Sequence, residues 1–151
     1  MTDIEIDGLI ATINTASRQL QTYLDEQLKP LKLTSSNYYF ILKINQAPTL
    51  TQDQLFKRIY LSQSNVTRRL EQLIRLGYVQ KQRSQTDGRS WSISLTSTGK
   101  ALVPKLNERL EYVNNGIFSG IDRVTQDRLM AALIKVEQNW LYNFSTLASR
   151  K

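Results

Sequence analysis

The stretch LSQSNVTRRLEQLIRLGYVQKQRSQTDGR, residues 61–89, decides the fold of this chain. Its first half predicts an amphipathic helix, because Val66, Leu70 and Leu73 recur at intervals of three and four residues and share one face. Ser62 suits the N-cap of this helix, and Gly77 suits its left-handed end. The opposite face carries Ser64, Arg68, Glu71 and Arg75. We therefore expect a helix that is packed on one side and presents polar side chains to a partner on the other.

A hairpin is expected directly after this helix. Residues 78–83 and 91–95 are the expected strands, and Trp91, Ile93 and Leu95 share one face at a period of two, as in a half-buried strand. The Asp-Gly pair at 87–88 between them is a strong turn signal. The sequence thus predicts a two-stranded hairpin with Arg83 near its base and Arg89 close to its tip.

Shorter helices are expected before this stretch. Thr51 and Gln54 have the spacing of a capping box, so a helix should begin after Thr51 and end before residues 60–61. Another helix is expected over residues 35–46, with Thr34 as its cap. Two helices joined by a few residues, the second with a polar face, form a helix-turn-helix, and a following hairpin makes it a winged helix. The expected fold class is therefore mostly α with a small β-hairpin wing.

Three long helices flank this domain. Apolar residues recur at helical spacing over residues 4–28, over residues 97–121 and after Thr125. Thr96 is the expected cap of the second helix and Thr125 that of the third, and a bend is expected at Pro104 in the second. A helix as long as the first extends about 35 Å, further than one small core can cover. Assembly of two identical chains is the economical way to bury such surfaces, and a self-contained bundle in one chain is the alternative. The expected division is a helical dimerisation domain at 1–32 and 100–151, and a winged helix-turn-helix DNA-binding domain at 33–99.

The chain is basic, with 20 Lys and Arg against 13 Asp and Glu and a formal net charge of +7. Residues 50–100 hold nine of these cations and three of the acids, a net charge of +6, whereas residues 1–49 and 101–151 carry −1 and +2. Basic charge gathered in one domain favours a polyanionic partner, most simply nucleic acid. A solvated basic surface is the alternative, and charge alone does not separate the two.

Composition excludes several classes of function. Cysteine and histidine are absent, which excludes disulfides, thiol redox sensing and nucleophile–histidine catalysis, and leaves only carboxylates for a metal. We expect no metal, no cofactor and no enzymatic activity, since a phosphate-binding glycine loop is absent as well. The chain has no apolar run of about 18 residues, and its N-terminus is acidic, unlike a signal peptide. The expected location is the cytoplasm, without a membrane partner.

Two motifs resemble a known family. The run from Asp87-Gly88-Arg89 to Leu95-Thr96-Ser97-Thr98-Gly99 resembles the D-x-R-x(5)-L-T-x-x-G signature of the MarR (multiple antibiotic resistance regulator) family. Residues 73–79, LIRLGYV, resemble the family's L-x-x-x-G-[LY]-[IV] passage from recognition helix to wing. The order of elements and the length also match, so the resemblance covers essentially the whole chain. It implies a dimeric winged-helix regulator of transcription, often responsive to small molecules.

The expected DNA contacts lie on the amphipathic helix and in the hairpin. A two-fold dimer presents two such helices to major grooves about one turn, or about 34 Å, apart. The candidate DNA-binding residues are Ser62, Gln63, Ser64, Asn65, Thr67, Arg68, Arg69, Arg83 and Arg89. Arg68 has the best geometry for a guanine edge, whereas Asn65 and Arg69 lie on the flanks and can either reach phosphate or fold back.

The resemblance adds roles for the hairpin. It implies that Arg89 is the wing arginine, which enters the adjoining minor groove. Asp87 is negative and so unsuited to DNA; with Gly88 it is expected to orient an arginine within the wing.

Regulation is the last expectation that the resemblance carries. A cleft between the dimer helices and the DNA-binding domain would take a ligand, and Arg18, Tyr23, Tyr38 and Tyr39 are the candidate lining residues, which suit an aromatic acid. Aromatic residues at helix junctions more often have only a packing role.

The leading hypothesis is a homodimeric, sequence-specific repressor that binds a palindromic double-stranded operator and is released by a small organic ligand. The alternative is a winged-helix protein–protein interaction module that binds an acidic partner.

Overall fold

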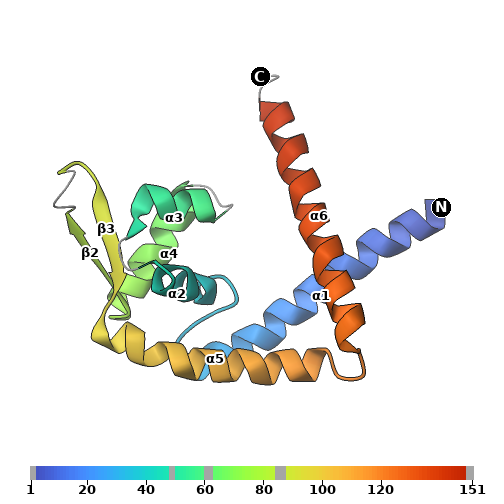
Figure 1. Cartoon of the computed structure of the whole chain (residues 1–151), viewed down its shortest axis with the longest axis horizontal. Coiled ribbons are helices and arrows are strands. Elements are labelled where there is room, and N and C mark those ends of the chain that lie inside the picture. Colours follow the sequence, from blue (N-terminus) through green and yellow to red (C-terminus); the bar gives the residue numbers. More distant parts are fainter. Residues whose placement is uncertain (1–2, 48–49, 60–62, 84–87, 149–151) are drawn as a thin grey trace. The chain divides into compact units, whose positions relative to one another are not determined.

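The computed structural model describes residues 3–47, 50–59, 63–83 and 88–148, with the backbone alone at 3–7, 58, 63 and 141–148. The chain begins with a long helix and then alternates short helices with short strands before two more long helices (Figure 1). In order, the elements are α1 (Asp3–Leu28), the 3-10 helix η1 (Lys29–Leu31), α2 (Tyr38–Asn45), β1 (Leu50–Thr51), α3 (Gln52–Arg58), α4 (Gln63–Arg75), β2 (Val79–Arg83), β3 (Trp91–Leu95), α5 (Ser97–Ile117) and α6 (Arg123–Ala148). This is the expected mostly helical winged helix-turn-helix.

The chain divides into two compact units, residues 1–113 and 114–151, with the boundary inside α5. The first unit holds one hydrophobic core, to which every helix and strand from the end of α1 to α5, except the short η1, contributes buried side chains. Its fully buried residues include Leu28, Phe40, Leu55, Leu73, Ile93 and Leu106. The winged helix is therefore built around a single core that also takes in the last turns of α1 and most of α5.

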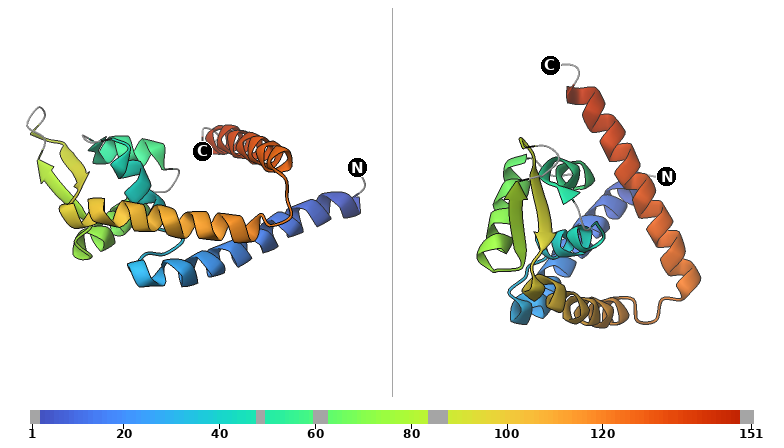
Figure 2. Two further views of the ribbon diagram at one scale, coloured as in Figure 1. Left: turned by 60° about the horizontal axis from the view of Figure 1, so that its bottom comes forward. Right: turned by 60° about the vertical axis from the view of Figure 1, so that its left-hand side comes forward.

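A small antiparallel sheet forms the wing, with the strand order β1-β3-β2. The expected hairpin of β2 and β3 is present, and β1 adds a third strand through the pair of Leu50 with Ile93. The hairpin lies at one end of the first unit (Figure 2). The register pairs Val79 with Leu95 at the helix side and Arg83 with Trp91 at the loop side. The expectation that Arg83 lies near the base was wrong, because Arg83 ends its strand next to the loop.

Two helix starts differ from the sequence-based expectation. α2 begins at Tyr38, not at residue 35, because Asn37 folds back: its Oδ1 accepts a hydrogen bond from the Thr34 amide at 2.8 Å and holds residues 34–37 in a turn. α6 begins at Arg123, and its cap is Asp122 rather than Thr125, since the Thr125 amide donates to Asp122 Oδ1 at 2.7 Å. These hydrogen bonds from Thr125 lower the pKa of Asp122, as expected for a carboxylate at a helix N-terminus.

The expected start of α3 and the expected end of α4 are confirmed. Thr51 and Gln54 form the capping box, with bonds of 3.1 and 3.0 Å in the two directions. Gly77 has φ of +78° after the end of α4. α5 continues through Pro104 but ends at Ile117, four residues before the expected end. The expected N-cap of α4, Ser62, lies outside the described residues.

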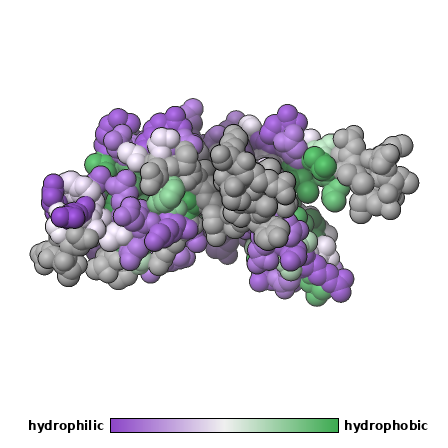
Figure 3. Space-filling model, turned by 90° about the horizontal axis from the view of Figure 1, so that it is seen from above, coloured by the Kyte–Doolittle hydropathy of each residue, from purple (hydrophilic) through white to green (hydrophobic). Residues whose placement is uncertain are grey.

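Several apolar side chains are exposed on the long helices. In the second unit, the exposed apolar residues of α6 include Val124, Met130, Ile134, Val136 and Trp140. The N-terminal half of α1 likewise exposes Leu9, Ile10 and Ile13. Apolar side chains reach the surface among the hydrophilic ones in the space-filling view (Figure 3). Within the described part of the chain, none of the helices combines the length and the apolar character that crossing a membrane requires.

The junction of wing and α5 is closely packed around Gly99. The Thr96 hydroxyl caps α5 by accepting from the Gly99 amide at 3.0 Å, and it donates to the Gly77 carbonyl. The Thr96 amide donates to the Tyr78 carbonyl at 3.0 Å. A Cβ added at Gly99 would fall on this same carbonyl oxygen, so only glycine fits the position.

Replacing Gly99 with alanine should therefore destabilise the fold. We expect Gly99→Ala to lower the free energy of unfolding by about 1–3 kcal/mol, because the methyl group must push the Tyr78 backbone away. Thr98→Ala is the matched control, since Thr98 is the exposed neighbour in the same helical turn and its replacement should be close to neutral. Urea unfolding followed by circular dichroism measures both. Equal stability of the two variants would refute the packing at this junction.

Candidate nucleic-acid interface

α4 has one buried and one exposed face. Val66, Leu70 and Leu73 are almost fully buried in the core, as their spacing predicts. The opposite side is exposed at Ser64, Arg68, Glu71 and Arg75. One face of α4 thus packs against the core, and its polar face is exposed and accessible to a partner.

The candidate residues at the start of α4 form a hydrogen-bonded group. Arg68 is exposed, and its Nη2 donates to Asn65 Oδ1 at 2.8 Å. Thr67 is half-buried, and its hydroxyl accepts from Gln52 Nε2 of α3 at 3.3 Å. A guanidinium carries five N–H donors, so the bond to Asn65 orients Arg68 and still leaves donors for a base edge. Ser62 lies outside the described residues, and the side chain of Gln63 is not described.

Arg69 has a different position. Its side chain is half-buried, and its Nε is a buried nitrogen without a hydrogen-bond partner among the described residues. Its positive charge lowers the pKa of Tyr39 on α2, which burial otherwise raises. Arg69 therefore lies close enough to Tyr39 for its charge to act on that phenol, and a phosphate contact for Arg69 stays a prediction.

The loop end of the wing gathers basic and aromatic side chains. Arg83 Nη1 donates to the Gly88 carbonyl at 2.8 Å, which ties β2 to the returning loop. Lys81 and Arg83 both lie over the Trp91 ring, at 4.9 and 5.2 Å from its centroid. Asp87, expected to orient an arginine, lies outside the described residues; the partner seen for Arg83 is the carbonyl of Gly88.

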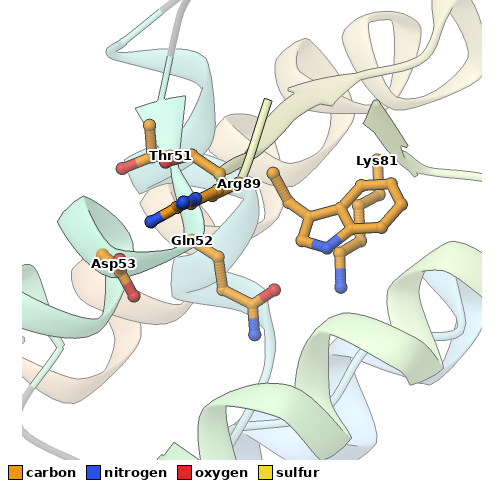
Figure 4. A pocket seen from close by; sticks show the side chains of 7 residues that line it. Thr51, Gln52, Asp53, Lys81 and Arg89 are labelled. Carbon is orange, nitrogen blue, oxygen red and sulfur yellow. The ribbon is translucent and has the colours of Figure 1, made fainter. Parts of the chain in front are cut away.

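A hollow of about 330 Å³ separates the wing from the start of α3. Its lining residues are Thr51, Gln52, Asp53, Lys81, Arg89, Ser90 and Trp91. In the close-up, the Arg89 side chain extends toward Thr51 and Gln52, on the side of the hollow opposite Lys81 (Figure 4). A second hollow of about 210 Å³ shares Gln52 and Asp53 and continues between α3 and α4 to Thr67. Wing, α3 and α4 thus border one polar surface.

Sequence reasoning missed Lys81, Gln52 and the contact role of Trp91. The alternation of the strands contained the signal, because residues at every second position share a face and so place Lys81 and Arg83 with Trp91. Gln52 gave no such signal, since its bond to Thr67 joins residues of two different helices.

The four candidate ligand residues do not share one environment. Tyr38 and Tyr39 are half-buried and pack edge to face, with ring centroids 5.8 Å apart, and Tyr39 also contacts Phe40 at 5.0 Å. Tyr23 packs against the core as well, whereas Arg18 is exposed on α1. Burial raises the pKa of both Tyr38 and Tyr39. In the described residues no group of three or more acidic side chains is placed to hold a metal ion.

Residues 31–90 match a family model described as MarR family. This match spans α2 to the end of the wing loop and confirms the resemblance that the motifs indicated. Solved structures share the fold over most of both chains. A MarR transcriptional regulator from Methanosarcina mazei Go1 has a TM-score of 0.78 at 23% identity, covering 90% of this chain and 98% of that one.

Two further structures extend this comparison. The transcriptional regulator SlyA has a TM-score of 0.82 at 20% identity, with 97% of this chain and 99% of that chain covered. A mutant MarR from E. coli complexed with operator DNA has a TM-score of 0.79 at 23% identity, with 87% and 95% covered. At these identities, the likeness concerns the fold.

The position of Arg69 can be tested through Tyr39. The pKa of Tyr39 is raised above its ordinary value of 10.0 by burial and lowered by Arg69, so Arg69→Met should raise it further. Nuclear magnetic resonance of the tyrosine rings against pH measures this, with Tyr39→Phe to assign the signal. The folded state holds the Tyr39 phenol proton more tightly than the unfolded chain does. The free energy of unfolding should therefore be unaffected by this group below about pH 10 and should fall as the pH rises above it.

Arg75→Met is the control for this titration. Arg75 lies on the exposed face of the same helix, and its removal also takes away one positive charge. An equal rise of the Tyr39 pKa in both variants would show that Arg69 acts only through net charge and does not lie against the ring.

Proposed function

We propose that this chain, a MarR-family protein by the match of residues 31–90 and by its fold, is a homodimeric regulator of transcription that binds specific double-stranded DNA. The observation that carries the proposal is the surface at the wing end of the first unit. There the basic wing lines one hollow and α4 lines a second through Val66 and Thr67, and both hollows share Gln52 and Asp53 of α3. Arg68, oriented by Asn65, follows Thr67 on the exposed face of α4.

The charge distribution supports a nucleic-acid partner. The segment from 50 to 100, which contains α3, α4 and the wing, carries nearly all of the net positive charge. Cations that neutralise DNA phosphates release condensed counterions, so affinity falls linearly with the logarithm of the salt concentration. A regulator of this kind acts where the DNA is, and we expect it in the cytoplasm.

Separate residues would give affinity and specificity. Arg68 lies on the exposed face of α4, where its guanidinium can address the two acceptors of a guanine edge in the major groove. Arg89 and Arg83, at the loop end of the wing, would reach the neighbouring phosphates or minor groove. The E. coli MarR mutant in the operator complex has the same fold, which supports a duplex as the partner.

Dimerisation is the second part of the proposal. α6 exposes a series of large apolar side chains along the described length, and the first half of α1 does the same. An exposed apolar helix face of this kind marks an interaction site in a soluble protein. A second copy of the chain would cover it and hold two α4 helices at the spacing of successive major grooves, which favours a palindromic operator.

Repression and release by a ligand form the third part. Occupancy of a promoter is enough for repression, whereas activation needs further contacts. A small organic or aromatic ligand would release the protein if it binds the DNA-incompetent arrangement more tightly. The half-buried rings of Tyr23, Tyr38 and Tyr39 offer apolar and hydroxyl groups for such a ligand, and Arg18 offers a charge for an acid.

An acidic protein is the alternative partner, and the same basic surface supports it. The two partners differ in sequence dependence. A DNA regulator selects a palindrome from a random duplex pool and holds it against excess competitor duplex at moderate salt, whereas an interaction module shows no preference among duplexes.

Arg68 and Arg89 should be needed for DNA binding. We expect Arg68→Ala and Arg89→Ala each to weaken binding to the selected palindrome by about 1–3 kcal/mol, or roughly 5- to 150-fold, without lowering the melting temperature. Fluorescence anisotropy with a labelled duplex measures the affinity. Arg123→Ala is the matched control, because it removes the same charge from an exposed ion pair with Asp127 in α6. If Arg68→Ala and Arg89→Ala both bind the palindrome like this control, the assigned DNA-binding surface is wrong.

The dimer should depend on the apolar side of α6. Leu133→Glu places a charge among the exposed apolar residues, so we expect a monomer in sedimentation analysis and a loss of palindrome binding. Gln138→Glu adds the same charge on a polar position of that helix and should stay dimeric. Leu133→Glu that sediments as a dimer would exclude this face as the interface.

A further inference from the structure

Trp91 is the first residue of β3 and has about 39% of its surface exposed. Two cations of the neighbouring strand lie over its ring. The Lys81 ammonium is 4.9 Å and the Arg83 guanidinium carbon 5.2 Å from the ring centroid. Both distances are within the range at which the negative face of an indole attracts a cation.

The strand register explains why these three side chains meet. Arg83 is directly opposite Trp91, and Lys81 is opposite Ile93, one pair further along the same face. This face begins with the buried pair of Val79 and Leu95. Toward the loop, the face therefore changes from hydrophobic core to one aromatic ring that carries two cations.

Further contacts fix this group relative to the rest of the surface. Arg83 also donates to the Gly88 carbonyl at 2.8 Å, so its guanidinium is held from two sides. Trp91 and Lys81 line the 330 Å³ hollow together with Arg89, which approaches from the opposite side (Figure 4). The ring thus lies among three of the wing's cations.

The ring performs two physical tasks here. Lysine and arginine side chains lose rotamer freedom when they are ordered, and a ligand that must order them binds more weakly. Lys81 and Arg83 are also like charges at adjacent positions on one face, where they repel each other. Contact with the indole orders both side chains and offsets part of this repulsion before any partner arrives.

We propose that Trp91 is a positioning residue for DNA binding, which acts by holding Lys81 and Arg83 ready for the phosphates of the duplex. The inference rests on the proposed function, since the partner is the same DNA. It assigns to Trp91 an indirect role: the cations contact the phosphates, and the indole holds the cations.

A double-mutant cycle tests this role. Trp91→Leu keeps an apolar side chain without a π face and should weaken binding to the selected palindrome about three- to tenfold, as expected for the loss of two exposed cation–π contacts. Trp91→Phe restores a π face and should recover part of the loss. In the background of Lys81→Gln with Arg83→Gln, Trp91→Leu should cause no further loss, because nothing remains for the ring to hold. Tyr112→Leu, which removes an exposed aromatic ring from α5, should bind like the parent.

A second measurement works without DNA. Protons above an aromatic ring resonate upfield, so the side-chain methylenes of Lys81 and Arg83 should be shifted upfield in the parent and return to ordinary positions in Trp91→Leu. Melting temperatures of all variants, followed by circular dichroism, show whether the fold is kept.

The outcomes separate the inference from the proposed function. A parent protein that binds no duplex preferentially would overturn the proposed function. A parent that binds, with a Trp91→Leu variant that binds equally well, would overturn the role of Trp91 alone. If Trp91→Leu weakens DNA binding by the same factor in the Lys81→Gln/Arg83→Gln variant, the role of Trp91 is also overturned, because the ring would then act on DNA or on the fold directly.

Discussion

The structure depends on the hydrogen bonds made by one residue between the wing and α5. The Thr96 hydroxyl accepts from the Gly99 amide and donates to the Gly77 carbonyl, while the Thr96 amide donates to the carbonyl of Tyr78. These bonds join the end of α4, the start of β2, the end of β3 and the start of α5 at one point. Because Gly99 has no side chain, α5 can approach the Tyr78 backbone closely enough to make them.

This junction fixes the geometry of the proposed DNA-binding surface. α4 and the wing leave it in different directions, and the buried pair of Val79 and Leu95 continues the core from one into the other. The Tyr78 hydroxyl adds a bond of 2.9 Å to the Leu31 carbonyl, which ties the same point to the segment after α1. Bonds in several directions leave the wing little freedom relative to α4, so Arg68 and the basic wing can meet one duplex without a large ordering cost.

The sequence predicted the parts of this fold that depend on local patterns. The period of Val66, Leu70 and Leu73 identified the buried side of α4, and the capping box at Thr51 placed the start of α3. The sequence did not decide between two neighbouring caps, and it did not give contacts between residues of different helices. Asp122 rather than Thr125 caps α6 because a carboxylate competes well for the first free amides, a choice that spacing alone leaves open. The effect of the Arg69 charge on Tyr39 joins α4 to α2, and the spacing of residues within α4 does not reveal it.

The basic wing follows from where the core stops. A strand pair brings every second residue to the inner face, and the first pair of the hairpin, Val79 with Leu95, is apolar because it lies on the core. Beyond Ile93 the side chains of this face, Lys81, Arg83 and Trp91, are exposed, so they must be compatible with water. Long cations meet this need, and one large ring among them gives them a fixed support that leucine or valine would not. The register that builds the core therefore also determines which cations stand together at the loop, and the charge of the wing is a consequence of strand pairing as much as of composition.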